Sequence, residues 1–549
     1  MLHRPTPNVN ICAWLAHVSS QVARKRGPSS RSKVRPDPNP APPSVGPDYL
    51  CRVTSLRGFG VLDVGASGGR AVLASTDGDR RWVEEVFRFE NAPVVAAGHS
   101  YWDLLGIYSN VCRAIQHLVT ACPSLESIGI DTWGCDFGVL DDRGRIIGNP
   151  YTYRDPARRE AMPIVEGIIG DQELFERVGT PLDSIMSVYQ LKALMDTASA
   201  EAQVGARFLM MPELLNYLLT GRDVNEFTNA TMTLLVDQSR RAWDESLIQR
   251  LGIPVSWFGE LLEPGTVIGG LSDEVAQSLA VPRLPVVLPA THDTASAVAG
   301  MPVAAGVVSP SWAFISLGTW AICGVELSEP VTDRQVREAG FGNEGGVEGT
   351  VMLARNLVGL WIIQECRKVW ERDRGSPVSW SEVMESVGTV DPWRSFIDVD
   401  DPRFGAVVPD MTKEVAGYCA ETGQPVPQTM GEIAACVYVS LVAKIQERLA
   451  DIQRFTGVPL EVVHAVGGGI QNRTLCQWLA DAAGVPVLAG PIETTSVGNA
   501  LMQFKAAGVI ESIAVGRDMV RKSFDVEAFE PSGADVWERV RTRYVAATS

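Results

Sequence analysis

The sequence lacks the features that mark several large classes of protein. It contains no run of about eighteen consecutive apolar residues, which argues against a membrane span. Its ten cysteines show no Cys-x-x-Cys spacing, so the pattern indicates reduced core cysteines of a cytoplasmic protein rather than a zinc site or a disulfide framework. Positive charge is scarce, and the formal net charge of −17 argues against a nucleic-acid partner.

The remaining bulk properties are those of a globular enzyme with more than one domain. The chain has 549 residues, which is too long for one hydrophobic core. Residues 1–57 differ from the rest, because they are rich in Pro and Ser, basic and poor in acids. We predict that this segment is a disordered tail or follows from an upstream start, in preference to a transit peptide of similar composition.

Ordered structure is predicted from about Gly58, and the first half begins with strands around a glycine turn. A helix, another strand and a hairpin follow, and residues 150–285 are predicted to be helical insertions that carry substrate contacts. The predicted elements are strands at 61–64, 70–74 and 82–89, a helix at 104–118, a strand at 128–134 and a hairpin at 137–147.

The second half repeats this opening. Strands are predicted at 312–316 and 320–324 around a glycine turn, helices at 358–370 and 433–455, a strand at 462–466, a helix at 473–483, a strand at 485–488 and a helix at 497–507. This repetition predicts a duplicated α/β architecture with a cleft between the halves.

The chemistry is expected to centre on the segment between the halves, where an apolar run ends in His292-Asp293-Thr294 and a small-residue helix follows. An acid at a strand-to-helix turn often caps the helix. The alternative is that Asp293 is a general base aimed at a substrate hydroxyl group.

Three glycine turns favour the second interpretation when they are taken together. They are Asp63 to Arg70, Ser316 to Thr319, and Gly467 to Gly469. Each alone could be an ordinary turn or helix start. As a set they suit two phosphate loops and one adenosine loop, and neither a P-loop nor a dinucleotide fingerprint is present.

Two further acidic groups are candidates for ligand binding. Asp63 is a candidate to position a hydrated Mg²⁺ ion, which keeps most of its water ligands and bridges phosphates. Trp133 lies between Asp131 and Asp136 and is either a core residue or the platform of a sugar site.

From about residue 58 to 530 the chain resembles the FGGY carbohydrate kinases. The resemblance rests on Asp63 to Arg70, Gly129 to Phe137, Tyr153 to Asp155, Phe227 to Thr231, His292 to Val298, Asn343 to Gly346, Asn356 to Gln364 and Val466 to Asn472. It implies two actin-like ATPase (ribonuclease H-like) domains with a cleft between them. We expect an N-terminal domain at 58–305, a nucleotide-binding C-terminal domain at 306–530 and a tail at 531–549.

The resemblance also implies roles for individual residues. Asp293 matches the general base, and Gly134, His292, Thr294 and Asn356 match sugar-site positions. The ATP-site matches are Ala66, Ser67, Gly68, Gly69, Arg70, Thr319, Gln364 and Gly468. Cys135 stands where the family pattern leads us to expect Val, which leaves the fine choice of substrate open.

The expected reaction is ATP-dependent phosphorylation of the 1-hydroxyl group of a ketose, with L-rhamnulose as the first choice and Mg²⁺ as cofactor. L-fuculose and xylulose are alternative substrates. A non-catalytic nucleotide-binding regulator of the same fold is a rival of another class, although such a protein needs no general base. The expected partners are a sugar and ATP, and the chain could be a monomer or a dimer.

Overall fold

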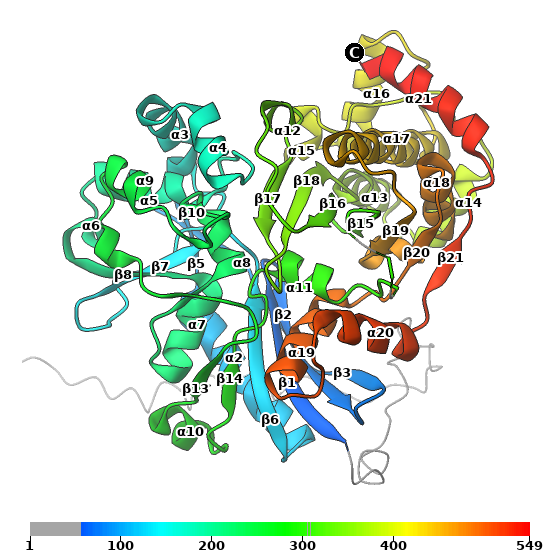
Figure 1. Ribbon diagram of the computed structural model, residues 1–549. Coiled ribbons are helices and arrows are strands. Elements are labelled where there is room, and N and C mark those ends of the chain that lie inside the picture. The colour runs from blue at the N-terminus through cyan, green and yellow to red at the C-terminus, as the bar shows by residue number, and fades with distance from the viewer. Residues whose placement is uncertain (1–55, 305, 308, 549) are drawn as a thin grey trace, which may run out of the picture. The chain divides into compact units, whose positions relative to one another are not determined.

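The computed structural model describes residues 56–549 except Ala305, Val308 and Ser549 (Figure 1). The predicted disordered segment 1–57 therefore lies almost entirely outside the described residues. The first strand begins at Arg57, whose guanidinium group forms an ion pair with Glu126. Within the described residues, no helix combines the length and the apolar character that crossing a membrane requires.

The first sheet has six strands in the order β13-β14-β6-β1-β2-β3. They are β1 (Arg57–Gly65), β2 (Gly68–Thr76), β3 (Arg81–Glu90), β6 (Leu125–Thr132), β13 (Val267–Gly270) and β14 (Pro285–Val287). β1 pairs antiparallel with β2 and parallel with β6, which in turn pairs parallel with β14. The carboxyl ends of β1, β6 and β14 therefore meet at one edge of the sheet.

The second sheet has seven strands in the order β17-β18-β16-β15-β19-β20-β21. They are β15 (Trp312–Leu317), β16 (Trp320–Leu327), β17 (Gly342–Gly345), β18 (Val351–Val358), β19 (Val462–Val466), β20 (Val487–Ala489) and β21 (Glu527–Phe529). β15 pairs antiparallel with β16 and parallel with β19, as β1 does with β2 and β6. The predicted duplication of an α/β unit is confirmed by this shared strand plan.

Helices cover both faces of the first sheet. Alternation along β1 sends Leu62 and Val64 into the cluster with α2 (Leu104–Ala121), whereas Phe59 and Val61 join the cluster that contains α19 (Thr494–Ala506). Asp63 lies on the same side as Phe59 and Val61. Its carboxylate therefore points to the face that α19 covers.

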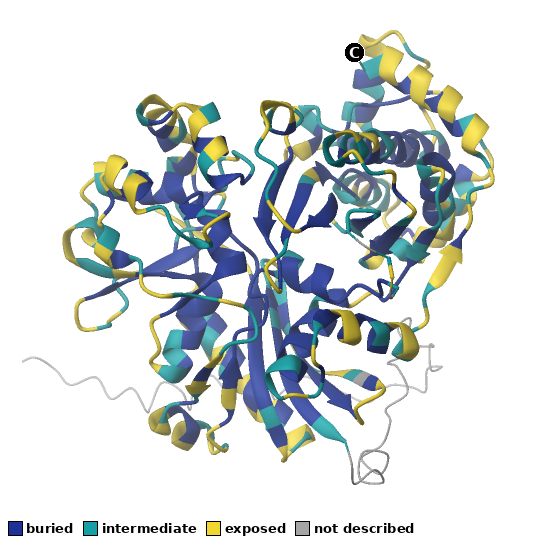
Figure 2. Ribbon diagram, in the orientation of Figure 1, coloured by how far each residue is buried: buried dark blue, intermediate teal, exposed yellow. Residues whose placement is uncertain are grey.

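The second sheet is covered by longer helices, among them α13 (Trp361–Arg374), α17 (Met430–Thr456) and α18 (Arg473–Ala483). A capping box of Thr429 and Glu432 begins α17, and Gly457, with a left-handed backbone, ends it. Most of this helix is buried, as Figure 2 shows by its dark ribbon.

Two helices meet where the two halves join. α11 (Asp293–Ala299) follows β14, and α19 follows β20. A Cβ atom at Gly498 would collide with the carbonyl oxygen of Ser296, and one at Gly300 would collide with that of Thr494. Glycine is therefore required for this close backbone contact, which fixes α11 against α19.

The structure departs from the sequence predictions in two places. β7 (Phe137–Asp141) forms the predicted hairpin with residues 145–147, through an antiparallel bridge between Leu140 and Ile146, but it also pairs along its length with β8 (Gly205–Met210), which was not predicted. Residues 531–549, predicted as a tail, contain α21 (Ala534–Thr548), whose Trp537 and Tyr544 are buried in the second core. The tail prediction missed these two apolar anchors, which lie on one face of a helix.

Candidate active site

Asp293 is the first residue of α11 and does not cap it. The N-cap residue is His292, and its side chain makes no capping hydrogen bond. The Asp293 carboxylate accepts a hydrogen bond from Thr294 Oγ1 at 3.3 Å and lines a cavity of about 160 Å³. Ser316 and Ile322 of the second sheet and Thr495 of α19 line the same cavity. Asp293 is therefore available to a ligand held between the halves.

The surroundings of Asp293 favour the protonated carboxyl group. About a third of its side-chain surface, 36%, still contacts solvent, although protein atoms crowd the carboxyl group. Burial, with a smaller contribution from the negative charge of Asp63, raises the pKa of Asp293 to about 7. A carboxyl group with this pKa is able to take up a proton near neutral pH.

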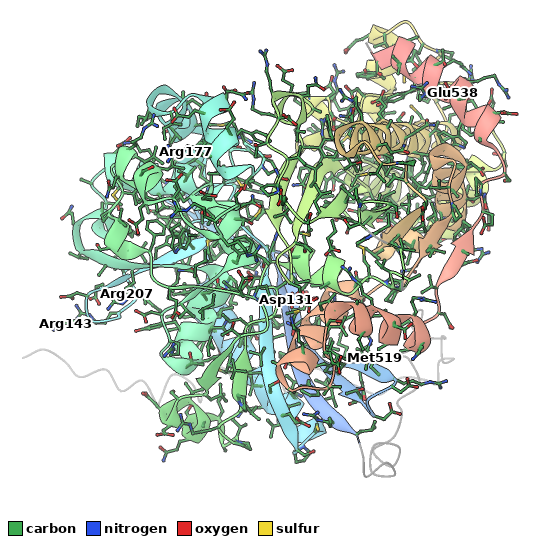
Figure 3. The ribbon with its side chains drawn as sticks, viewed as in Figure 1. Asp131, Arg143, Arg177, Arg207, Met519 and Glu538 are labelled. Carbon is green, nitrogen blue, oxygen red and sulfur yellow. The ribbon has the colours of Figure 1, made fainter. Side chains whose placement is uncertain are left out.

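Two more carboxylates stand at paired positions of neighbouring strands. Asp63 of β1 is in register with Asp131 of β6, and Figure 3 labels Asp131 beside the strands of the first sheet. Arg70 Nη2 donates to Asp63 Oδ2 at 2.6 Å, and Asn499 Nδ2 of α19 donates to Asp131 Oδ2 at 2.6 Å. Burial, and then the charge of Asp63, raises the pKa of Asp131 well above its usual range.

Asp131 retains one oxygen without a hydrogen-bond partner. Its Oδ1 atom is buried, and no described residue donates to it. A buried acceptor without a donor is costly unless a proton, a water molecule or a ligand satisfies it. The strand ends of the first sheet therefore form an acidic group with spare acceptor capacity.

The predicted sugar-site residues lie around Asp293. His292 Nε2 lies 3.6 Å from Asp293 Oδ1, and a Cβ atom at Gly134 would lie 3.2 Å from this same nitrogen. Thr294 lines the Asp293 cavity. Asn356 is exposed on β18 directly opposite Ile322, a lining residue of that cavity, so both side chains project from the same face of the sheet.

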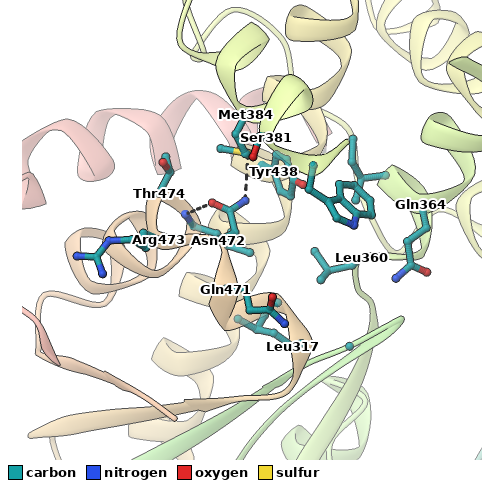
Figure 4. A pocket seen from close by; sticks show the side chains of 16 residues that line it. Leu317, Leu360, Gln364, Ser381, Met384, Tyr438, Gln471, Asn472, Arg473 and Thr474 are labelled. Atoms are coloured by element: carbon teal, nitrogen blue, oxygen red, sulfur yellow. Dashed lines mark hydrogen bonds between the residues drawn. The ribbon is translucent and has the colours of Figure 1, made fainter. Parts of the chain in front are cut away.

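A second and larger cavity lies on the second half of the chain. Its volume is about 660 Å³, and it brings together Gly318, Gln364 and Gly468 from three separate segments (Figure 4). Thr319 Oγ1 donates to Gln364 Oε1 at 3.3 Å, which links the β15–β16 turn to α13. A Cβ atom at Gly468 would meet nothing within 4 Å, so this glycine faces open space.

In the β1–β2 turn, unlike at Gly468, the glycines are required by close packing against neighbouring atoms. None of Gly65, Gly68 and Gly69 has a positive φ angle. A Cβ atom at Gly68 would lie 2.8 Å from the carbonyl oxygen of Phe89, and one at Gly69 would overlap the Phe89 ring. The backbone of Gly65 and Ser67 is held by Asn91, whose side-chain and main-chain N–H groups donate to it.

The structure does not bring all predicted ATP-site residues to one cavity. Among the described residues, Ala66, Ser67, Gly68 and Gly69 are absent from the linings of both cavities. The Arg70 guanidinium group contacts Asp63 and also forms an ion pair with Glu493, the N-cap residue of α19. In this conformation Arg70 therefore links the β1–β2 turn to α19.

Comparisons with known proteins assign the two halves of the chain to two domains of one family. The model of the N-terminal domain of the FGGY family of carbohydrate kinases matches residues 59–300, and that of the C-terminal domain matches residues 313–507. The chain belongs to the FGGY family of carbohydrate kinases. The predicted family is thereby confirmed.

Relatives and solved structures extend this assignment. This kinase is 34% identical over 480 residues to "Rhamnulokinase" of Bacteroides thetaiotaomicron, covering 87% of this chain and 97% of the relative. It is 32% identical to "Rhamnulokinase" of Bacillus subtilis, covering 87% and 96%. A xylulose kinase structure from Rhodospirillum rubrum aligns with a TM-score of 0.74 at 17% identity, covering 89% and 98%. The predicted two-domain sugar kinase fold is confirmed.

The acidic edge of this FGGY kinase fits a hydrated cation better than a directly bound one. Among the described residues, no group of three or more His, Cys, Asp and Glu side chains could hold a metal ion alone. Asp63 and Asp131 nevertheless stand side by side, and Asp131 Oδ1 lacks a donor. Mg²⁺ is bound by one or two carboxylates, water molecules and substrate phosphates, and these residues match that donor set.

Several residues that shape the site were not predicted from the sequence. Glu226 is buried and accepts hydrogen bonds from the backbone N–H groups of Thr228 and Thr291, so it anchors the segment before His292. Asn499 holds Asp131, as described above. The only sequence signal for Glu226 was its position beside the Phe227 to Thr231 motif, and none pointed to Asn499.

Asp136, the acid that follows Trp133, has a structural role. Asp136 Oδ2 accepts hydrogen bonds from the indole nitrogens of Trp102 at 2.6 Å and Trp133 at 2.8 Å. Asp136 Oδ1 accepts from Arg158 Nη2 at 2.7 Å. Both oxygens of this buried carboxylate are therefore occupied, which leaves Gly134 rather than Asp136 to face the sugar-site residues. Cys135 adopts a positive φ of 76° in this turn.

Proposed function

We propose that this kinase transfers the γ-phosphoryl group of ATP to the 1-hydroxyl group of a ketose and that its substrate is L-rhamnulose. The class of reaction follows from the family of carbohydrate kinases. The choice of sugar is supported by relatives named rhamnulokinase at 32–34% identity over most of both chains. The observation that carries the mechanism is the position of Asp293 in a cavity lined by both halves.

Asp293 acts as the general base in this proposal. The attacking hydroxyl group donates its proton to the carboxylate while its oxygen attacks the γ-phosphorus atom, and the bond from that phosphorus to the bridging oxygen of ADP breaks. The pKa of about 7 leaves a substantial ionised fraction at neutral pH. His292, Thr294, Gly134 and Asn356 surround the sugar.

The nucleotide occupies the larger cavity in the same proposal. Its base and ribose lie among Gly318, Gln364 and Gly468, and Thr319 supports Gln364. The β1–β2 turn, Ala66 to Arg70, lies at the end of the strand that carries Asp63, where backbone N–H groups can bind phosphate oxygens. Binding of ATP then requires Arg70 to exchange its ion pair with Glu493 for a phosphate.

Asp63 and Asp131 would hold Mg²⁺ through its water ligands. When bound, the ion neutralises charge on the β- and γ-phosphates. Asn499 keeps the Asp131 carboxylate oriented, and Arg70 does the same for Asp63.

We also propose that the functional division of the chain is 58–305 and 306–530 and that the kinase acts in the cytoplasm. The eight described cysteines are free thiols, which suits a reducing compartment.

The test is an ATP-consumption assay with L-rhamnulose, L-fuculose, D-xylulose and glycerol, in which phosphorus NMR identifies the product. We expect the highest kcat/KM with L-rhamnulose and a phosphate ester at its 1-position. Neighbouring sugars should still react, because one methyl group contributes only about 1–3 kcal/mol of discrimination. A higher kcat/KM with xylulose would move the assignment to another ketose, and ATP binding without turnover would favour a nucleotide-binding regulator.

A further inference from the structure

Two buried, complementary side chains face each other beside Asp293, and among the described residues their facing atoms have no hydrogen-bond partner. His292 Nδ1 and Glu344 Oε2 lie 3.5 Å apart. Both atoms are shielded from solvent, and no described residue makes a hydrogen bond to either. The two residues come from the stretches that match different family domains, since His292 precedes α11 and Glu344 lies in β17.

Glu344 is held in place through both of its neighbours. The backbone N–H group of Asn343 donates to Gly179 O at 2.7 Å, and that of Gly345 donates to Thr231 Oγ1 at 3.0 Å. A Cβ atom at Gly345 would lie 2.8 Å from the Phe227 ring, so only glycine fits there. These contacts of its two neighbours fix the backbone from which the buried Glu344 side chain projects toward His292.

His292 is also held by contacts of its backbone and of its ring. Its backbone N–H group donates to Thr228 Oγ1 at 3.2 Å, and its ring packs against Gly134 on one side. The ring nitrogen that faces away from Glu344 lies 3.6 Å from Asp293 Oδ1. Glu344, His292 and Asp293 thus form a row that ends at the cavity.

The ionisation of the imidazole group makes its tautomer important. Burial lowers the pKa of His292, and the nearby Glu344 only partly opposes this effect. The ring is therefore neutral at neutral pH, with one nitrogen as donor and the other as acceptor. Whichever nitrogen carries the proton decides what the ring offers to a ligand.

We propose that Glu344 is a positioning residue that accepts a hydrogen bond from the Nδ1–H group of His292 and thereby makes Nε2 an acceptor. Nε2 and the Asp293 carboxylate then present two acceptors 3.6 Å apart. Such a pair binds two hydroxyl donors of one sugar and disfavours a carbonyl oxygen beside His292. This inference rests on the proposed function in that it takes the ligand to be a sugar.

The test combines kinetics with nitrogen NMR of the histidine rings. In the full chain, Glu344→Ala should raise the KM for the sugar and lower kcat/KM about 10- to 100-fold, the range found for residues that orient metal-binding histidines. The KM for ATP should stay within about twofold. Glu344→Gln keeps an acceptor oxygen at nearly the same position and should recover most of the loss.

The NMR measurement follows the protonated nitrogen of His292, assigned by comparison with His292→Asn. We expect the proton on Nδ1 in the wild type and in Glu344→Gln, and a mixture of tautomers in Glu344→Ala. Glu338→Gln is the matched control, because Glu338 is an exposed residue at the end of α12 (Arg334–Glu338) and pairs with Arg334. It should change neither measurement.

Two results would overturn the proposal. One is a wild-type His292 ring with its proton on Nε2, and the other is a Glu344→Ala variant with an unchanged KM for the sugar. Thermal unfolding of each variant shows whether it folds. The NMR result does not depend on turnover, so it judges the role of Glu344 even if no ketose in the panel is phosphorylated, which would count against the proposed function instead.

Discussion

The two sheets share one strand plan and differ in what stands at equivalent strand ends. On the first sheet the paired positions near the ends of β1 and β6 are Asp63 and Asp131. On the second sheet the paired positions at the ends of β15 and β19 are Ser316 and Val466. In the function that we propose, this difference is a division of roles: the first sheet supplies carboxylates for the reaction, and the second supplies a cavity with glycine turns for the nucleotide.

The helices that follow the equivalent strands β14 and β20 differ in the same way. α11 begins with Asp293, whereas α19 begins with Thr494, Thr495 and Ser496. A helix N-terminus favours negative charge, whether of an acid or of a bound anion, but at Asp293 burial outweighs this effect and raises the pKa. Their glycine contact holds both helix starts near one cavity, which Asp293 and Thr495 both line.

The largest effect on activity is expected when the Asp293 carboxylate of the first half is replaced by a neutral group. Asp293→Asn keeps the size of the side chain but cannot accept the proton. We expect kcat to fall by about 10²–10⁴-fold with the affinities for sugar and ATP nearly unchanged. Steady-state kinetics and calorimetric titration of both ligands measure these quantities, and a variant that turns over at the wild-type rate would remove Asp293 from the mechanism.

The same variant also reports on stability. Because the folded-state pKa of Asp293 is about 7 and the ordinary value is 3.8, the wild type loses stability from this group as the pH rises between these values. Asp293→Asn lacks that loss, so its melting temperature relative to the wild type should rise from pH 4 to pH 7. A helix-capping role predicts instead a loss of roughly 1 kcal/mol in the variant.

The next largest effect should come from the contact that joins the halves. Gly498→Ala places a methyl group against the backbone of α11, so we expect a loss of about 1–3 kcal/mol of stability and a lower kcat. Gly417→Ala is the matched control in α16 (Met411–Glu421), where the added methyl group meets open space. The control should be neutral or slightly more stable. Equal melting temperatures of the two variants would contradict the assigned contact.

A smaller and selective effect is expected in the nucleotide cavity. Gln364→Ala removes the acceptor for Thr319 and one wall of the cavity. A hydrogen bond of about 0.5–1.5 kcal/mol corresponds to an increase of about 2- to 12-fold in the KM for ATP. The KM for the sugar should not change. If the KM for the sugar changed and the KM for ATP did not, the proposed division of roles between the two sheets would be wrong.

The smallest effect is expected from removing the first 54 residues. Their composition is unsuited to a hydrophobic core, and the first described ion pair begins at Arg57. A chain that starts at Ser55 should keep its melting temperature and its kcat. Loss of folded protein on this truncation would show that the segment contributes to the core.

The fold could be predicted in large part because its strongest signals are local. The apolar run and glycine turn at Val61–Gly69 predicted the first hairpin, and the sequence Arg473–Ala483 predicted α18 to the residue. The hairpin at 137–147 was predicted, but the pairing of β7 with β8, about 70 residues away, was not, because such a distant partner leaves no local pattern in the sequence. The resemblance supplied the family, which periodicity alone would not have done.

The candidate site was predictable as a set of residue types but not as a geometry. Asp293 stood out because a polar triplet interrupts an apolar run. Other features of the site arise only when β6, β17 and α19 pack together. They are the unpartnered oxygen of Asp131 and the short distance between Glu344 and His292, and no residue spacing in the sequence predicts these contacts. For the same reason the sequence could not show that both carboxylate oxygens of Asp136 accept hydrogen bonds from two Trp residues and one Arg.

The most direct test of the central claim is the pH dependence of kcat/KM for the sugar, measured for the wild type and for Asp293→Asn at saturating Mg²⁺ and ATP. A general base must be ionised to act, so wild-type kcat/KM should rise as the pH increases and level off above a pKa of about 7. Phosphate groups of ATP also titrate near neutral pH, which is why the variant is measured under identical conditions. We expect the residual activity of Asp293→Asn to lack the rise that belongs to Asp293. If the variant shows the same rise as the wild type, another group accepts the proton and the account of Asp293 is wrong.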